Sequence, residues 1–134
     1  MMMSHGTQRP ARVVIAEDEA LLRYTLKLIV EEHCEIVGEA QDGYAAIEMT
    51  EQLRPDVVLL DISMPRMGGI EAARRIRESV PEVRIIIVSN HSSSVYMEEA
   101  LNRGAHGYVV KGSAVVQLPK AIDEVLNGRI FRPE

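Results

Sequence analysis

The sequence predicts an α/β fold in which a five-stranded parallel sheet is covered by helices on both faces. Two patterns predict this class: short apolar runs alternate five times with amphipathic helical segments, and most of the apolar runs are continuous, as in strands buried on both faces. The connections between them are short, and right-handed crossovers leave few topologies for such a chain. With 134 residues, the chain fits one domain whose core is large enough to fold unaided.

The first two strand and helix pairs fill the N-terminal part of the chain. Residues 13–16 (VVIA) predict a buried strand, and the apolar spacing over about 20–32 predicts a helix. A weaker strand at 35–40 is diluted by a glycine and a glutamate, which is typical of a sheet edge. Asp42 then offers an N-cap for a second helix around 46–53.

The rest of the chain repeats this alternation three times. In order, it predicts a strand at 57–60, a helix at 70–80, a strand at 85–88, a helix at 95–103, a strand at 107–110 and a final helix that ends at 127–128. Pro119 lies where this last helix would already be running. Because proline is tolerated only in the first turn of a helix, we predict a late start near Gln117.

The composition excludes several classes of protein. The net charge is -5 and the 15 lysines and arginines are scattered, which argues against a chain that contacts nucleic acid directly. Cys34 is the only cysteine, so it forms no internal disulfide, and we expect an inert, buried thiol in a reducing, cytoplasmic compartment. No apolar run is long enough to span a membrane, and residues 1–10 contain no stretch typical of a signal peptide.

Polar residues stand at the carboxyl ends of four predicted strands. Glu17 and Asp18 follow the first strand, Asp61 the third, Ser89 the fourth and Lys111 the fifth. In a parallel sheet these ends share one edge, where three carboxylates repel one another unless a cation joins them. An all-oxygen site suits Mg²⁺, with Mn²⁺ or Ca²⁺ as substitutes. A metal, an ammonium and a hydroxyl around Asp61 would neutralise phosphoryl oxygens while this carboxylate attacks phosphorus.

The order of these motifs resembles that of bacterial response-regulator receiver domains. The resemblance covers about residues 12–129, from IAEDE through LLDISMPRMGG and VSN to YVVKG. It implies a flavodoxin-like (βα)5 three-layer sandwich with strand order 2-1-3-4-5. It further implies that a sensor histidine kinase, or a small donor such as acetyl phosphate, phosphorylates Asp61. Mg²⁺ would be bound by Glu17, Asp18, Asp61 and the backbone carbonyl of Ser63.

The resemblance also implies a conformational switch. Lys111 and Ser89 would contact the phosphoryl oxygens, Ser89 would move inward and Tyr108 would rotate inward. These movements would alter the surface formed by the fourth helix, the fifth strand and the fifth helix, where such domains dimerise or meet partners. The positions that modulate phosphate lifetime or loop movement are Ser63, Asn90 and His91. Catalysis would be limited to the domain's own phosphotransfer and dephosphorylation.

Three segments point to the NarL/FixJ (LuxR-like) subfamily of receivers: IRESVPEVRIIIVS, ALNRGAHGYVVKG and AIDEVLNGRIF. Such receivers are normally followed by a helix-turn-helix domain that binds DNA and regulates transcription. We therefore expect a disordered tail at 1–11, a receiver domain at 12–128, and at 129–134 the start of a linker to an output domain absent from this chain.

Two other functions compete with a phosphorylated switch. A haloacid-dehalogenase-like phosphatase also uses a strand-end aspartate, but it needs a second aspartate two residues later, where this chain has Ser63. A pseudo-receiver, an interaction module that takes no phosphate, stays open because Asn90 is bulkier than the residue usual after Ser89.

Overall fold

The protein forms a parallel sheet between two layers of helices. The computed structural model describes residues 9–133. The elements are β1 (Ala11–Ala16), α2 (Ala20–Val30), β2 (Cys34–Ala40), α3 (Gly43–Leu53), β3 (Val57–Asp61), α4 (Gly69–Ser79), β4 (Arg84–Ser89), α5 (Ser94–Asn102), β5 (Gly107–Val110), the 3₁₀ helix η1 (Lys111–Ser113) and α6 (Ala114–Leu126). The strands lie in the order β2-β1-β3-β4-β5, and every pair is parallel, which confirms the predicted flavodoxin-like topology.

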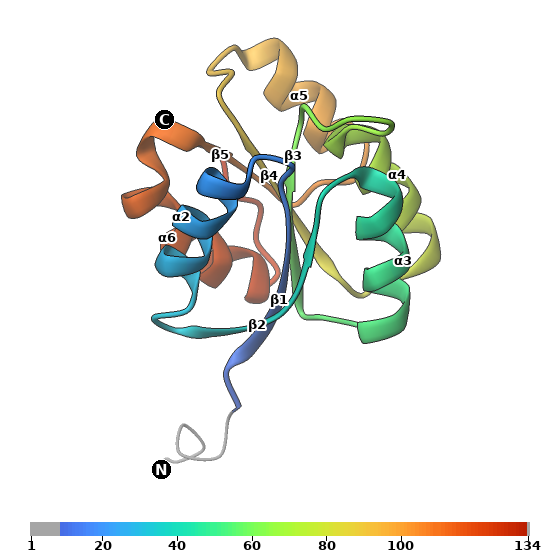
Figure 1. The fold of residues 1–134 in the computed structure, drawn as a ribbon. Coiled ribbons are helices and arrows are strands. Elements are labelled where there is room, and N and C mark those ends of the chain that lie inside the picture. Colours follow the sequence, from blue (N-terminus) through green and yellow to red (C-terminus); the bar gives the residue numbers. More distant parts are fainter. Residues whose placement is uncertain (1–8, 134) are drawn as a thin grey trace.

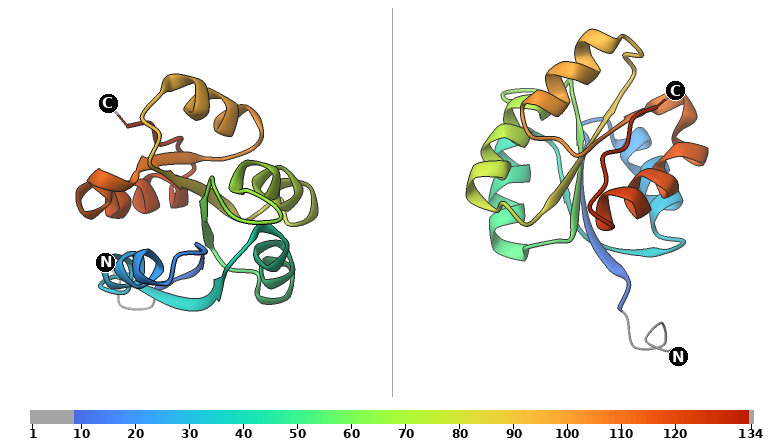
Figure 2. Two further views of the ribbon diagram at one scale, coloured as in Figure 1. Left: turned by 45° about the horizontal axis from the view of Figure 1, so that its top comes forward. Right: turned by 180° about the vertical axis from the view of Figure 1, so that it is seen from behind.

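The helices divide between the two faces of the sheet. Helices α2 and α6 cover one face, and α3, α4 and α5 cover the other, as Figure 1 and both views of Figure 2 show. None of the helices within residues 9–133 has the length and apolar character that a membrane span requires.

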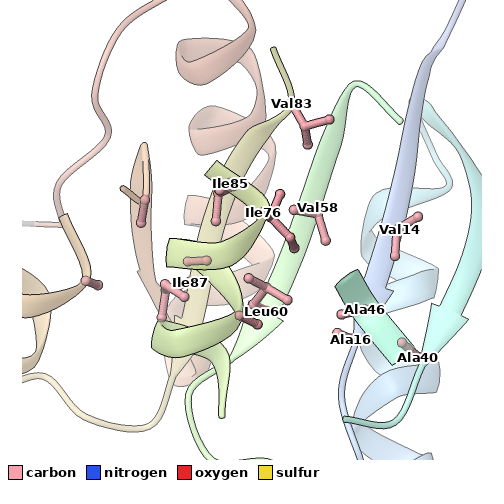
Figure 3. Packing of buried hydrophobic residues seen from close by; sticks show 14 of the residues in the cluster. Val14, Ala16, Ala40, Ala46, Val58, Leu60, Ile76, Val83, Ile85 and Ile87 are labelled. Atoms are coloured by element: carbon pink, nitrogen blue, oxygen red, sulfur yellow. The ribbon is translucent and has the colours of Figure 1, made fainter. Parts of the chain in front are cut away.

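Each central strand supplies alternate side chains to two separate cores. In β3, Val58 and Leu60 face α3 and α4, whereas Val57 and Leu59 face α2 and α6. The same alternation continues in β1 and β4, and Figure 3 shows the α3/α4 side of the core. All five residues of β3 are buried, as expected for the central strand of a sheet covered on both faces.

The start of α6 differs from the prediction. The helix begins at Ala114, directly after η1, and runs through Pro119, so the predicted late start near Gln117 is wrong. Proline removes a backbone donor from a helix, but Pro119 lies on the exposed side of α6, where water can solvate the carbonyl left without that donor. Meanwhile Ala114 and Leu118 are buried against the sheet, and this apolar contact favours the longer helix.

Both ends of the described chain contact the rest of the domain. Strand β1 begins at Ala11, and the Arg9 guanidinium pairs with the Asp56 carboxylate at 2.9 Å. At the other end, Phe131 lies beside β5, where it forms a parallel bridge with Gly107. The first eight residues of the predicted tail lie outside the described part of the structure.

Candidate functional site

The carboxyl edge of the sheet brings together the acidic residues that the sequence places after β1 and β3. Carboxylate oxygens of Glu17, Asp18 and Asp61 all lie within 4.8 Å of one another. Glu17 and Asp61 are buried, whereas Asp18 is exposed and opens the cluster to solvent. Three acidic side chains so close together make a site that could hold a metal ion.

Lys111 supplies the positive charge of this cluster. Its ammonium nitrogen lies 3.0 Å from Asp61 Oδ1 and 3.1 Å from Glu17 Oε1. Burial lowers the pKa of Lys111, but hydrogen bonds and charge attraction from Asp61 and Glu17 outweigh burial and raise the pKa above its ordinary value. Lys111 is therefore a fixed cation that pairs with the carboxylates of Asp61 and Glu17.

Glu17 is the carboxylate most affected by this environment. Burial raises its pKa and the nearby Asp61 charge adds to the increase, although Glu17 Oε2 accepts a hydrogen bond from the Glu19 N–H at 3.1 Å. The other oxygen, Oε1, has no aligned hydrogen-bond donor within the described residues, even though the Lys111 ammonium is close. A buried carboxylate oxygen without a donor is well suited to coordinate a cation.

The loop after Asp61 folds tightly back against the end of β3. The Gly69 N–H donates to the Ile62 carbonyl at 3.0 Å. A Cβ atom on Gly69 would lie 2.2 Å from the Asp61 carbonyl oxygen, so only glycine fits at the start of α4. Ser63, two residues beyond Asp61, is exposed at the outer part of this loop.

A second contact joins this loop to the start of α3. Asp42 is buried, accepts a hydrogen bond from the Ala45 N–H at 2.8 Å as the N-cap of α3, and also pairs with Arg66. Arg66 lies in the left-handed region with φ of 65°. The sequence predicted the cap but missed the ion pair, because nothing in the local pattern connects two residues so far apart in the chain.

The loop after β4 links Ser89 to Tyr108. The hydroxyl oxygen of Ser89, which is buried, accepts a hydrogen bond from the His91 N–H at 2.9 Å, and the Tyr108 hydroxyl donates to the His91 carbonyl at 2.7 Å. Tyr108 is 1% exposed and thus already lies inside the protein. Asn90 and His91 are exposed, and the His91 ring stacks on Tyr96 with 4.1 Å between centroids.

These residues combine cation-binding and anion-binding groups around one carboxylate. The acidic cluster could hold a divalent cation, and the Lys111 ammonium at 3.0 Å from Asp61 Oδ1 is a group that could pair with an oxyanion there. Ser89 is the last residue of β4, the strand that pairs with β3. The edge of the sheet where these groups meet is the usual position of a binding site in open α/β folds.

Comparison with known proteins agrees with this geometry. Residues 13–123 match the family described as the response regulator receiver domain. The chain is 34% identical to a two-component response regulator of the LuxR family from Aurantimonas sp. SI85-9A1, with a TM-score of 0.88 over 92% of this chain and 89% of that one. The chain therefore belongs to the response-regulator receiver family, and its relatives are of the NarL, DegU and LuxR type.

The curated relatives are longer than this chain. The transcriptional regulatory protein DegU from Brevibacillus brevis is 35% identical over 132 residues, which cover 97% of this chain and 56% of DegU. The nitrate/nitrite response regulator NarL from Escherichia coli is 37% identical over 133 residues, 96% of this chain and 61% of NarL. The chain thus spans little more than half the length of these regulators.

Proposed function

We propose that this domain is a phosphorylation-controlled switch in which Asp61 accepts a phosphoryl group from a sensor histidine kinase. The observation that carries the proposal is the position of the buried Asp61 carboxylate, 3.0 Å from the Lys111 ammonium and beside Glu17 and Asp18. An Asp61 oxygen attacks phosphorus, the new P–O bond forms as the bond to the donor breaks, and the donor imidazole or acetate leaves. The domain catalyses only this transfer and the later hydrolysis.

Mg²⁺ is the cation that we assign to the acidic cluster. The donors are hard carboxylate oxygens, and we add the backbone carbonyl of Ser63 as a further ligand, so the set fits Mg²⁺, Mn²⁺ or Ca²⁺ better than zinc. When bound, the metal neutralises charge that develops on the phosphoryl oxygens. Lys111 neutralises this charge from the other side, and the Ser89 hydroxyl donates to one oxygen.

Phosphorylation of Asp61 changes the surface formed by α5, β5 and α6. We assign this face, beneath which Tyr108 is buried, to homodimerisation or partner binding. Ser63, Asn90 and His91, which are exposed around the site, set the phosphate lifetime through access of water. By analogy with its relatives, the whole protein acts in the cytoplasm and regulates transcription through a DNA-binding domain that these 134 residues do not include.

Intact-mass measurement after incubation with acetyl phosphate and Mg²⁺ tests this function. We expect one acid-stable, base-labile phosphoryl adduct in the parent chain and none in Asp61→Asn, which keeps the size of the side chain but removes its charge and its nucleophilic oxygen pair. Treatment with EDTA should also prevent the adduct.

The other outcomes assign a different function. An adduct that persists in Asp61→Asn would mean that another residue is the nucleophile. If the parent chain gives no adduct and also fails to bind beryllofluoride, a mimic of the phosphoryl group, the domain is a pseudo-receiver that acts only as an interaction module.

A further inference from the structure

The segment predicted as the start of a linker folds back along the free edge of β5. We name residues 129–133 the C-terminal strap. Gly128, with φ of 81°, reverses the chain at the end of α6. The Phe131 N–H then donates to the His106 carbonyl at 2.9 Å, and the Tyr108 N–H donates to the Phe131 carbonyl at 3.1 Å. The strap therefore pairs with the outer edge of the sheet like the beginning of a sixth strand.

Side chains fasten the strap to the helices on both sides of β5. Arg132 pairs with Glu98 of α5 at 2.7 Å, and Arg129 pairs with Glu124 of α6 at 2.9 Å. The Phe131 side chain is partly buried and packs against the core beneath α6. All four charged side chains are more than a third exposed, so each ion pair contributes little and the strap is held by many weak contacts. Such a segment can be released without unfolding the domain.

Tyr108 connects the strap to the loop after Ser89. The backbone N–H of Tyr108 donates to the Phe131 carbonyl, while the side-chain hydroxyl of Tyr108 donates to the His91 carbonyl. The same His91 donates its N–H to the Ser89 hydroxyl oxygen. Three consecutive hydrogen bonds therefore run from Ser89, at the edge where Asp61 lies, to the strap on the outer edge of the sheet.

We propose that the C-terminal strap is a conformational latch that is docked on β5 when Asp61 is unmodified and loosens when Asp61 carries a phosphoryl group. The inference rests on the proposed function of Asp61. When the Ser89 hydroxyl turns to a phosphoryl oxygen, the loop that contains His91 must move with it. The Tyr108 hydroxyl then loses the carbonyl that it contacts, and the end of β5 that holds the strap shifts.

Release of the strap has a structural consequence for the rest of the regulator. The docked strap covers the backbone edge of β5 between α5 and α6, which is the face that we assign to partners. Loosening exposes this edge and also frees residues 129–133 from the domain. One event thus changes both the partner surface and the position of whatever follows the domain.

Amide hydrogen exchange of the full 134-residue chain, measured by NMR with and without Mg²⁺ and beryllofluoride, tests the latch. We expect exchange of the Tyr108 and Phe131 amides to accelerate at least about fivefold, the lower end of typical coupling between sites. The Asp56 amide, which donates to the Arg12 carbonyl at 2.8 Å between the amino-terminal ends of β3 and β1, serves as the reference that should not change.

Reciprocal variants test the coupling from the other side, because linkage is symmetric. Phe131→Pro removes the N–H that donates to His106 and the packed ring, and it should tighten beryllofluoride binding several-fold in an NMR titration. Glu98→Gln only weakens the ion pair with Arg132, so it should tighten beryllofluoride binding by a smaller factor. This variant keeps the test valid if Phe131→Pro folds poorly. Arg54→Gln breaks the similarly exposed Arg54–Glu82 pair, 2.9 Å long and remote from the strap, and should leave affinity unchanged.

The outcomes separate the latch from the phosphorylation function. Unchanged or slower exchange at Tyr108 and Phe131 in a chain that does bind beryllofluoride would overturn the latch and leave the function of Asp61 intact. The same holds if Phe131→Pro and Glu98→Gln bind the mimic no more tightly than the parent. Failure of the parent chain both to bind beryllofluoride and to form the acetyl phosphate adduct would overturn both proposals.

Discussion

Mild acid should destabilise the protein through one buried side chain, His106. This residue is 8% exposed, and its Nδ1 accepts a hydrogen bond from the Ile85 N–H at 3.0 Å. Burial lowers the pKa of His106 from 6.5 to about 4, and the positive charges of Arg77 and Arg84 add to this effect. Protonation would place a proton on the nitrogen that now accepts the hydrogen bond.

The sign and size of the effect follow from linkage. Because the pKa of His106 is about 4 in the folded protein and 6.5 ordinarily, the unfolded chain binds the proton first. The stabilisation is therefore complete above pH 6.5 and is lost as the pH falls toward 4. The difference between the two pKa values of His106 corresponds to about 3 kcal/mol of unfolding free energy. About 2 kcal/mol of this stabilisation should be lost between pH 7 and pH 5.

Urea unfolding at a series of pH values between 7 and 5 measures this loss. We compare the parent with His106→Asn, whose amide oxygen is an acceptor that does not titrate in this range. The variant should lose about 2 kcal/mol less than the parent, while His33→Asn, a change at an exposed histidine, should follow the parent. Equal losses in the parent and in His106→Asn would refute the reasoning, because all other titrating groups are shared.

Two further predictions concern the site and α6. Glu17→Gln should raise the melting temperature without metal and weaken the stabilisation by Mg²⁺, as measured by calorimetry. Burial raises the pKa of the Glu17 carboxyl above its ordinary value of 4.5, so the folded protein holds this proton more tightly than the unfolded chain does. The stability that Glu17 contributes is therefore present below pH 4.5 and is lost as the pH rises through the higher pKa of the folded state. At pH 7 the ionised Glu17 side chain thus destabilises the metal-free protein. Pro119→Ala should raise the free energy of unfolding by roughly 1–2 kcal/mol, because the helix regains a backbone donor; an unchanged urea midpoint would contradict this.

The sequence predicted the sheet and the grouping of its polar edge because both depend on local patterns. Continuous apolar runs mark strands that are buried on both faces, and a parallel sheet places all carboxyl ends together. These two patterns are enough to predict that Glu17, Asp18, Asp61 and Lys111 lie close together, as the structure shows.

The features that the sequence did not predict depend on contacts between distant residues. The acceptor role of His106, the pair of Asp42 with Arg66 and the inward position of Tyr108 each need a partner that no local pattern identifies. The position of Phe131 beside β5 is harder still to predict from the sequence. The hydrogen bonds that hold it there join backbone groups, so no particular side chain indicates them. The helix through Pro119 was missed because its earlier start depends on the burial of Ala114 and Leu118 against the sheet, which is a tertiary contact.

The register of the sheet ties the stability of the fold to the geometry of the site. Ala16 lies opposite Leu60, and Asp61 lies opposite Val88, so the last apolar pair of the core is followed directly by the first charged side chain. A slip of one residue would turn Asp61 toward the opposite face and would move Leu60 or Ile62 into its place, because side chains alternate along a strand. Burial of the apolar residues of β3 therefore fixes the position of Asp61 against Lys111. The core holds three repelling carboxylates within 4.8 Å, and a bound cation or a phosphoryl group can then relieve or redistribute that charge.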